Sequence, residues 1–390
     1  MLLYIWVRVE MTSSVVMYDR KLSNLIVALG GNGIRECYQC GSCTAICPIS
    51  ENFSISFRRT IKYAQLGLEK KLVNDLTPWI CHACGECSNS CPRDANPSEL
   101  MMTFRRYLTT KYDWTGLSRL FYFSKKVELF TILILSLLTG VVIYLFHGPI
   151  ILDSVELDAF APVSTIEFVG LIILAILALI LITNVYRMYR FTVTASMKLP
   201  FKTYLTEFIK IVPFNFLTQN LSQYCNDKRY WINHLLIFYG FVVLFVCTLV
   251  DFVLRLFQRT DLLFSVVPSL NLNVINMIGI VAGVVLLYGG FTTIYGRVKK
   301  SRPIWKSSHI TDWTFIIVIV LVVITGLMTV IFKSVGLPLL TYVTYSLHLM
   351  LIVPLIILAF FEKGLHLIYR PFALYFARLN ELKSKGVGNI

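Results

Sequence analysis

Apolar residues gather in long uninterrupted runs in the C-terminal part of the chain. Six runs supply the roughly 20 consecutive apolar residues that a helix needs to cross the hydrocarbon core of a bilayer. They occupy residues 127–147, 165–186, 231–254, 272–295, 312–332 and 340–362. Because the runs are continuous and do not alternate with polar residues, they predict membrane-spanning helices and exclude the strands of a membrane barrel.

The part before residue 127 is mixed in polarity and contains no such run. In the stretch SFRRTIKYAQLGLEKKLV, apolar residues such as Ile61, Ala64 and Leu68 recur at helical spacing, which predicts a helical N-terminal domain. The apolar stretch at residues 2–7 lacks the basic start and the cleavage site of a signal peptide. We expect residues 1–25 to be poorly ordered.

The distribution of charge gives the orientation of the spans. The chain is 56% hydrophobic and only 15% charged, yet its net charge is +14. Lys and Arg are concentrated after the second, fourth and sixth runs, whereas the first loop carries Asp153, Glu156 and Asp158. By the positive-inside rule, the basic loops, the C-terminal tail and the N-terminal domain face the cytoplasm of an inner-membrane protein. Because topology and anionic lipid account for the charge, nucleic-acid binding is not expected.

Two cysteine motifs carry the clearest chemistry in the sequence. CYQCGSCTAICP begins at Cys37 and CHACGECSNSCP begins at Cys81, and both follow C-x2-C-x2-C-x3-C-P. This spacing is that of two-cluster bacterial ferredoxins, in which the fourth cysteine of each motif binds the other cluster. Disulfides are not expected in a reduced cytoplasmic domain. Structural zinc, which uses paired C-x2-C knuckles, is the alternative.

The crossed arrangement predicts two [4Fe–4S] sites that share one fold. The first would contain Cys37, Cys40, Cys43 and Cys91, and the second would contain Cys81, Cys84, Cys87 and Cys47. His82 lies beside a complete quartet and is therefore expected at the surface or next to a cluster, without being a ligand. Gly41 and Gly85 fall where the backbone must wrap around a cluster.

Histidines at the ends of the apolar runs predict a haem site. Ionisable residues within spans are costly and are usually functional. His234 begins the third run and His366 follows the sixth, so both lie near the cytoplasmic surface, and they form a candidate ligand pair for a haem b that carries electrons. The alternative is a pair of interfacial histidines with no ligand role.

A second, outer site is less defined. His348 and His366 are separated by five helical turns, about 27 Å, which is the spacing of two haems stacked across a bilayer. The outer ligands would be His348 and His147. His348 could instead hydrogen-bond a quinone. Asp251 and Arg255, one turn apart on the third run, are further candidates for a quinone site, and the alternative is an interfacial ion pair at a helix end.

The chain also resembles known proteins. The N-terminal motifs and WICHACGECSNSCPRD resemble the iron–sulfur C subunit of heterodisulfide reductase. The segments WINHLLIFYGF and LHLMLIVPLIILAFFEKGLHLIYRP are similar to the cytochrome b subunits of heterodisulfide reductase and respiratory nitrate reductase, except that Leu244 stands where the latter has a second histidine. The fusion resembles the membrane subunit of the quinone-interacting membrane-bound oxidoreductase complex. This resemblance implies flavin-bearing and iron–sulfur cytoplasmic partner subunits, a menaquinone-type quinone and a role in sulfate-reduction energy metabolism.

The sequence thus predicts an all-α protein, in which a helical two-cluster ferredoxin domain precedes a six-helix cytochrome b bundle. The expected divisions are residues 1–25 (N-terminus), 26–112 (ferredoxin-like domain), 113–126 (linker), 127–372 (membrane domain) and 373–390 (cytoplasmic tail). The chain contains no G-x-G-x-x-G or P-loop motif. The predicted function is electron transfer between quinone and a cytoplasmic partner through two [4Fe–4S] clusters and one or two haems b. The alternatives are a subunit of a thiol–disulfide or sulfite-reduction-associated complex and a redox-inert, zinc-bearing membrane anchor.

Overall fold

The structure is a computed structural model that describes residues 18–53, 55–194, 198–219, 228–257, 265–267 and 272–384. Within these ranges the protein is helical, apart from a short antiparallel ribbon formed by β1 (Ser265–Val267) and β2 (Leu272–Asn273). The predicted all-α fold class is confirmed.

The N-terminal domain is built from short helices around a compact core. They are α1 (Leu22–Ala28), η1 (Asn32–Ile34), α2 (Ser42–Ala45), α3 (Ser50–Phe53), α4 (Phe57–Gln65), α5 (Glu69–Val73), α6 (Thr77–Ile80), α7 (Glu86–Asn89) and α8 (Pro97–Tyr112). The Ser56 side chain caps α4 by accepting a hydrogen bond from the backbone N–H of Arg59. Ile61 and Ala64 of α4 are fully buried, as their spacing predicts.

The folded domain begins earlier than the sequence indicated. Leu22 and Ile26 of α1 have no exposed surface, so α1, which begins within the segment expected to be poorly ordered, packs into the core of the domain. Residues 1–17 lie outside the described residues.

Among the described residues, six helices are long and apolar enough to cross a membrane, which confirms the predicted spans. They are α10 (Lys125–Phe146), α12 (Val163–Thr192), α14 (Lys228–Leu256), α15 (Val274–Val298), α16 (Ile310–Val335) and α17 (Pro338–Phe361). The connecting helices are α9 (Leu117–Phe123), α11 (Leu157–Phe160), η5 (Pro303–Trp305) and η6 (Lys363–Leu365).

Small residues allow neighbouring spans to approach closely. A Cβ atom on Gly240 of α14 would lie 2.8 Å from Leu286, and one on Gly289 of α15 would lie 2.7 Å from Ile237. Packing through small residues and interhelical hydrogen bonds is typical of membrane helices. Asn233 adds such a bond, since its Nδ2 donates to Thr293 at 2.9 Å. This close packing fixes the position of α14, which carries His234.

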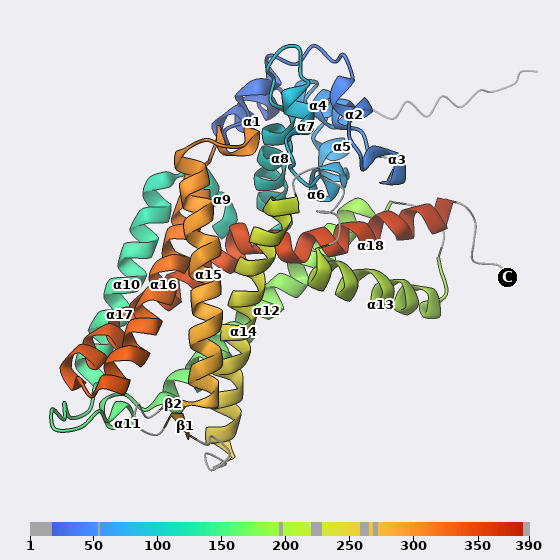
Figure 1. Cartoon of the computed structure of the whole chain (residues 1–390). Coiled ribbons are helices and arrows are strands. Elements are labelled where there is room, and N and C mark those ends of the chain that lie inside the picture. Colours follow the sequence, from blue (N-terminus) through green and yellow to red (C-terminus); the bar gives the residue numbers. More distant parts are fainter. Residues whose placement is uncertain are drawn as a thin grey trace, which may run out of the picture.

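Two further helices, α13 (Phe201–Thr218) and α18 (His366–Ser384), lie across one end of the spans and pack against each other (Figure 1). Helix α18 continues through residue 372, where the sequence placed the start of a tail. Leu379 in its second half is fully buried. The C-terminal segment up to residue 384 is therefore part of the folded protein.

The N-terminal domain sits on the end of the bundle that carries α18 (Figure 1). Arg187 at the end of α12 donates to the backbone oxygen of Tyr112 at 2.9 Å, and Asn96 donates to Ser307, before α16, at 3.3 Å. The rings of Trp79 and Tyr369 meet edge to face with centres 5.0 Å apart. The domain thus packs at the end where the basic loops occur.

Candidate functional site

The first predicted cysteine set surrounds one cavity. Cys37, Cys40 and Cys43 of the first motif and Cys91 of the second line the same pocket. Helices α2 and α7, which carry parts of the two motifs, pack against each other. The fold therefore brings together the four residues that the crossed ferredoxin spacing predicts.

The second set is more deeply buried. Cys81 and Cys87 are 4% and 6% exposed, and Cys47 of the first motif lies close enough to act electrostatically on both. Burial raises the pKa of Cys81 to about 11, and burial with the neighbouring thiols of Cys81 and Cys84 raises the pKa of Cys87 further. Such thiols become metal ligands only where a positive centre offsets their charge.

The backbones of the two motifs have the same local shape. Gly41 and Gly85 have φ of 92° and 95°, and Gln39 and Ala83, two residues before each, are also left-handed at 67° and 58°. At Gly85 a Cβ atom would lie 3.0 Å from Pro303 as well. Glycine is required because the chain must turn tightly between the second and third cysteines.

A [4Fe–4S] cluster takes one cysteine on each of its four iron atoms, and each predicted set offers four. A structural zinc ion would need its four ligands around a single point, with Zn–S distances of about 2.3 Å. Across the described ranges, no group of three Cys, His, Asp or Glu side chains is already placed to hold a single metal ion.

His82 connects the second cysteine set to the membrane part. Contrary to a surface position, it is 8% exposed, and its Nδ1 accepts a hydrogen bond of 2.6 Å from Arg370 of α18. Arg370 also donates to the backbone oxygen of Trp79 at 3.2 Å. Burial and the Arg370 charge lower the pKa of His82, so the ring is neutral.

The predicted histidine pair is brought together. The Nε2 atoms of His234 and His366 face each other at 3.5 Å, with ring planes at 80°. The Nδ1 of His366 hydrogen-bonds the backbone oxygen of Lys363, which leaves its Nε2 as the nitrogen with a free lone pair. A ring nitrogen that donates to a carbonyl while the other faces a partner is typical of metal-binding histidine.

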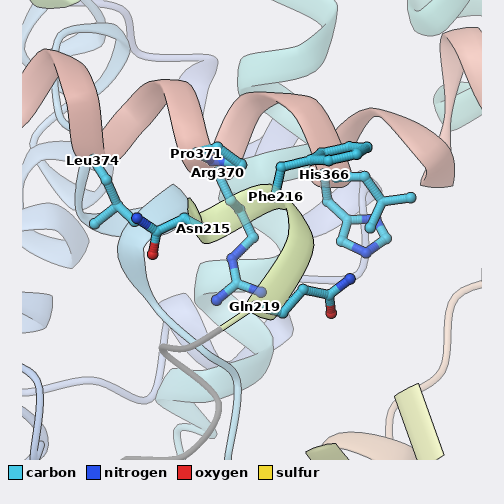
Figure 2. Close-up of a pocket in the computed structure, with 8 residues that line it drawn as sticks. Asn215, Phe216, Gln219, His366, Arg370, Pro371 and Leu374 are labelled. Atoms are coloured by element: carbon cyan, nitrogen blue, oxygen red, sulfur yellow. The ribbon is translucent and has the colours of Figure 1, made fainter. Parts of the chain in front are cut away.

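A small pocket lies next to His366. It is lined by Asn215, Phe216, Gln219, His366, Leu367, Arg370, Pro371 and Leu374, which come from α13, the residue after it, and α18 (Figure 2). The buried Nε2 of Gln219 has no hydrogen-bond partner among the described residues. Apolar side chains, an arginine and an amide thus gather beside His366, and these are the residue types that would hold a haem with its anionic propionates.

His147 and His348, the histidines predicted to hold an outer haem, do not face each other. His348 packs against Gly326, and its Nδ1 bonds the backbone oxygen of Val322 at 2.9 Å and the Thr325 hydroxyl at 3.1 Å. His147 bonds the backbone oxygen of Gly148 at 2.7 Å. Among the described residues no contact joins His147 and His348, so the outer haem stays a prediction that no contact supports.

The outer charged pair forms as expected. Arg255 Nε lies 2.8 Å from Asp251, and its Nη1 lies 3.2 Å from Asp158 of the first loop. A buried oxygen of Glu167 has no hydrogen-bond partner within the described ranges. Asp251 therefore has a structural role as the ion-pair partner of Arg255.

Two functional arginines were not found from the sequence. In the sequence, Arg370 counts among the basic residues that indicate the orientation of the spans. Arg105 lies in a segment of mixed polarity. Arg105 donates to the backbone oxygens of Pro78, at 2.6 Å, and of Cys81, and it is 7% exposed. The only local signal is the i, i+4 spacing that places Arg370 one turn after His366.

The fold thus combines a helical N-terminal domain, which carries the two four-cysteine motifs, with a part that contains six membrane-length helices among the described residues. Residues 33–95 match the 4Fe-4S dicluster domain family. The match supports iron–sulfur clusters and a role in electron transfer.

The N-terminal part is also similar to the C subunits of an oxidoreductase, heterodisulfide reductase. A protein of Archaeoglobus profundus that is named as similar to this C subunit is 37% identical over 95 residues, 24% of this chain and 50% of the relative. The C subunit of the H(2):CoB-CoM heterodisulfide,ferredoxin reductase of Methanothermobacter marburgensis is 37% identical over 75 residues, 19% of this chain and 40% of the relative. An iron–sulfur C subunit of the CoB--CoM heterodisulfide reductase of Methanocaldococcus jannaschii is 36% identical over 78 residues, 20% and 41% respectively. The chain spans half or less of the length of these relatives.

Proposed function

We propose that this chain is the electron-transfer subunit of a membrane oxidoreductase. It passes electrons between a membrane quinone, of the menaquinone type, and a cytoplasmic partner. Two [4Fe–4S] clusters and one haem b held by His234 and His366 would accept and release single electrons. The partner subunits carry the substrate-side chemistry, with flavin and further iron–sulfur centres.

The observation that carries the proposal is the hydrogen bond between Arg370 and His82. His82 follows Cys81 directly, and Arg370 is one helical turn from His366, so a single contact joins the two candidate cofactor sites. Tyr230 adds a second connection, since its ring centre lies 6.3 Å from that of His82 and 6.5 Å from that of His234. Short packed routes of this kind suit electron transfer between two centres.

The histidine pair suits a carrier of electrons. Two imidazoles that bind one iron from opposite sides leave no open position for a substrate. The Lys363 carbonyl holds the ring of His366 in place, and the packed helix α14 holds His234. Arg370 offers a positive charge at the edge of the adjoining cavity.

Orientation follows from charge. The iron–sulfur domain packs on the end of the bundle with the basic loops, which the positive-inside rule assigns to the cytoplasm of an inner-membrane protein. The place in sulfate-reduction energy metabolism rests on the resemblance of the two fused halves to the quinone-interacting complex.

A second candidate is the corresponding subunit of a complex that reduces a disulfide, because the relatives are named as heterodisulfide reductase subunits. Purification with native partners distinguishes the two. Quinol-dependent reduction of a disulfide by the complex would favour the second candidate. A flavin-bearing partner without that activity would favour the first.

His366→Ala and His234→Ala test the haem. Each should abolish the reduced-haem absorption band while the iron–sulfur signals in electron paramagnetic resonance (EPR) remain, because each removes one half of the ligand pair. His309→Ala, at the same end of the bundle, is the matched control and should keep the band. An unchanged haem band per protein in both ligand variants would refute the ligand assignment.

A further inference from the structure

Buried charges gather where the iron–sulfur domain meets the spans, and we call this group the ionic junction. Its carboxyl groups are those of Glu99, Glu128, Asp312 and Glu362, and its cations are those of Arg106, Arg297 and Lys363. Four carboxyl groups thus face three cations. Glu128 and Glu362 are only 1% and 2% exposed, so water does not screen their charge.

The three cations form ion pairs with only two of the four carboxyl groups, those of Asp312 and Glu99. Asp312 forms ion pairs with Lys363, with Arg297 at 3.7 Å and with Arg106 at 3.8 Å. Arg106 also lies 2.8 Å from Glu99. Among the described contacts, no ion pair reaches Glu128 or Glu362.

Glu128 and Glu362 are also short of hydrogen bonds. The Thr314 hydroxyl donates to one oxygen of Glu128. The other oxygen of Glu128 and both oxygens of Glu362 have no hydrogen-bond partner in the described part of the chain. An ionised carboxylate buried without a partner costs several kcal/mol, so one of two such neighbours keeps its proton.

Groups from three neighbouring helices face this pair, together with the adjoining Lys363. Glu362 is faced by Glu128 of α10, Asp312 of α16, Tyr122 of α9 and the adjoining Lys363, and Glu128 is faced by the same Asp312 and Lys363. Burial, and then the negative charge of Glu128, raise the pKa of Glu362, while Lys363 opposes them. Two interacting carboxyl groups of this kind titrate as a unit.

The neighbours of the pair extend toward His309 on one side and toward His366 on the other. The ring of Tyr122 lies 6.3 Å, centre to centre, from that of the half-buried His309. Burial and Arg106 lower the pKa of His309 to about 3, so its neutral ring accepts a proton on one nitrogen while it donates from the other. On the other side, the short helix η6 joins Glu362 to His366.

We propose that Glu128 and Glu362 form a proton-binding site that shares one proton at rest and binds a second when the His234–His366 site gains an electron. The second half of this statement rests on the proposed function. One electron, from quinol or from the iron–sulfur side, reduces the iron held by the histidines. One proton, from water at the His309 end, forms an O–H bond on the remaining carboxylate and offsets the added charge.

Infrared spectroscopy tests the resting proton without any need for haem. The wild type minus Glu362→Gln difference spectrum should contain the C=O band of a protonated carboxyl group, shifted in D₂O, and Glu128→Gln should alter the same band. Glu156→Gln, on the outer loop, is the control and should leave it unchanged. Glutamine matches the shape of protonated glutamate, so the fold is kept. No protonated carboxyl band at neutral pH would overturn the proposal.

Redox titration tests the coupling. The midpoint potential of the haem should fall with rising pH, approaching 59 mV per unit, the value for one proton per electron. Either Gln variant should flatten this slope, whereas Glu156→Gln should not. A slope that is the same in all forms would overturn the coupling. A protein that binds no haem would refute the proposed function and leave the infrared result to decide the resting site.

Discussion

Replacement of Arg106 by Met tests how a buried ion pair stabilises the iron–sulfur domain. Arg106 is 2% exposed, lies 2.8 Å from Glu99, and donates at 2.7 Å to the backbone oxygen of Leu29. Removal of one partner from a buried ion pair typically costs about 3–5 kcal/mol because a buried charge is left uncompensated. With a urea m-value of about 2 kcal/mol per M, the unfolding midpoint should fall by roughly 2 M.

A surface pair gives the matched control. Arg93 and Glu36 lie 3.7 Å apart with more than half of each side chain exposed. Such pairs contribute about 0–1 kcal/mol, so Arg93→Met should move the midpoint by less than roughly 0.5 M. The assay is the loss of cluster absorbance with urea in detergent. Equal shifts in the two variants would refute the reasoning from burial.

The pH dependence should identify Glu99 as the source of the cost. Burial raises the pKa of Glu99 from 4.5 to about 7 even beside Arg106. The folded protein therefore holds the Glu99 proton at pH values where the unfolded chain has lost it, and stability falls as pH rises through this window. Without Arg106 the pKa of Glu99 in the folded protein should rise further. The loss of stability caused by Arg106→Met should therefore be larger near about pH 8 than near about pH 6.

A second substitution should recover most of the loss. Replacing both members of a buried ion pair by apolar residues is often neutral. Arg106→Met with Glu99→Met should therefore be more stable than Arg106→Met alone, and it should lose the pH dependence assigned to Glu99. About 1–3 kcal/mol should remain lost, because the backbone oxygen of Leu29 is left without its donor.

Cys43→Ser and Cys91→Ser should each remove the same EPR signal, since both side chains line one cavity; loss of two different signals would contradict the crossed arrangement. Asp251→Asn should slow quinol turnover at normal haem and iron content, whereas Asp153→Asn should not. Full activity in the Asp251 variant would move the quinone site to the cytoplasmic end. Arg370→Leu should slow electron transfer between cluster and haem in stopped-flow spectra while both spectra remain, because it removes the bond to the neighbour of Cys81; an unchanged rate would exclude this route.

The spans and the cysteine sets were predictable because their signals are local. A helix that crosses a bilayer must be apolar along its whole length, and cluster ligands must follow a fixed spacing. The pairing of His234 with His366 was also within reach, since both lie at one depth of the membrane. The structure adds what depth alone does not give, namely that the two Nε2 atoms face each other at 3.5 Å.

The contacts that join the domains were beyond the sequence because they connect distant parts of the chain. His82 and Arg370 are separated by 288 positions, and neither has a local pattern that identifies the other. The ionic junction was missed for the same reason. Glu128, Asp312 and Glu362 stand at the ends of apolar runs, where charges usually face water, yet all three are buried.

These contacts also bear on the orientation of the protein. Arg187, Arg297, Lys363 and Arg370 count as basic signals in the sequence, yet the structure uses each of them as a hydrogen-bond donor or ion-pair partner. If these four residues were the only basic residues at this end, domain docking would explain the charge asymmetry, and the positive-inside rule would say nothing about orientation. Lys202, Lys210, Lys299 and Lys300 remain exposed at that end, whereas the first loop at the opposite end is acidic. The exposed lysines therefore preserve the charge bias by themselves, and the cytoplasmic placement proposed for the iron–sulfur domain does not depend on the residues that hold it in place.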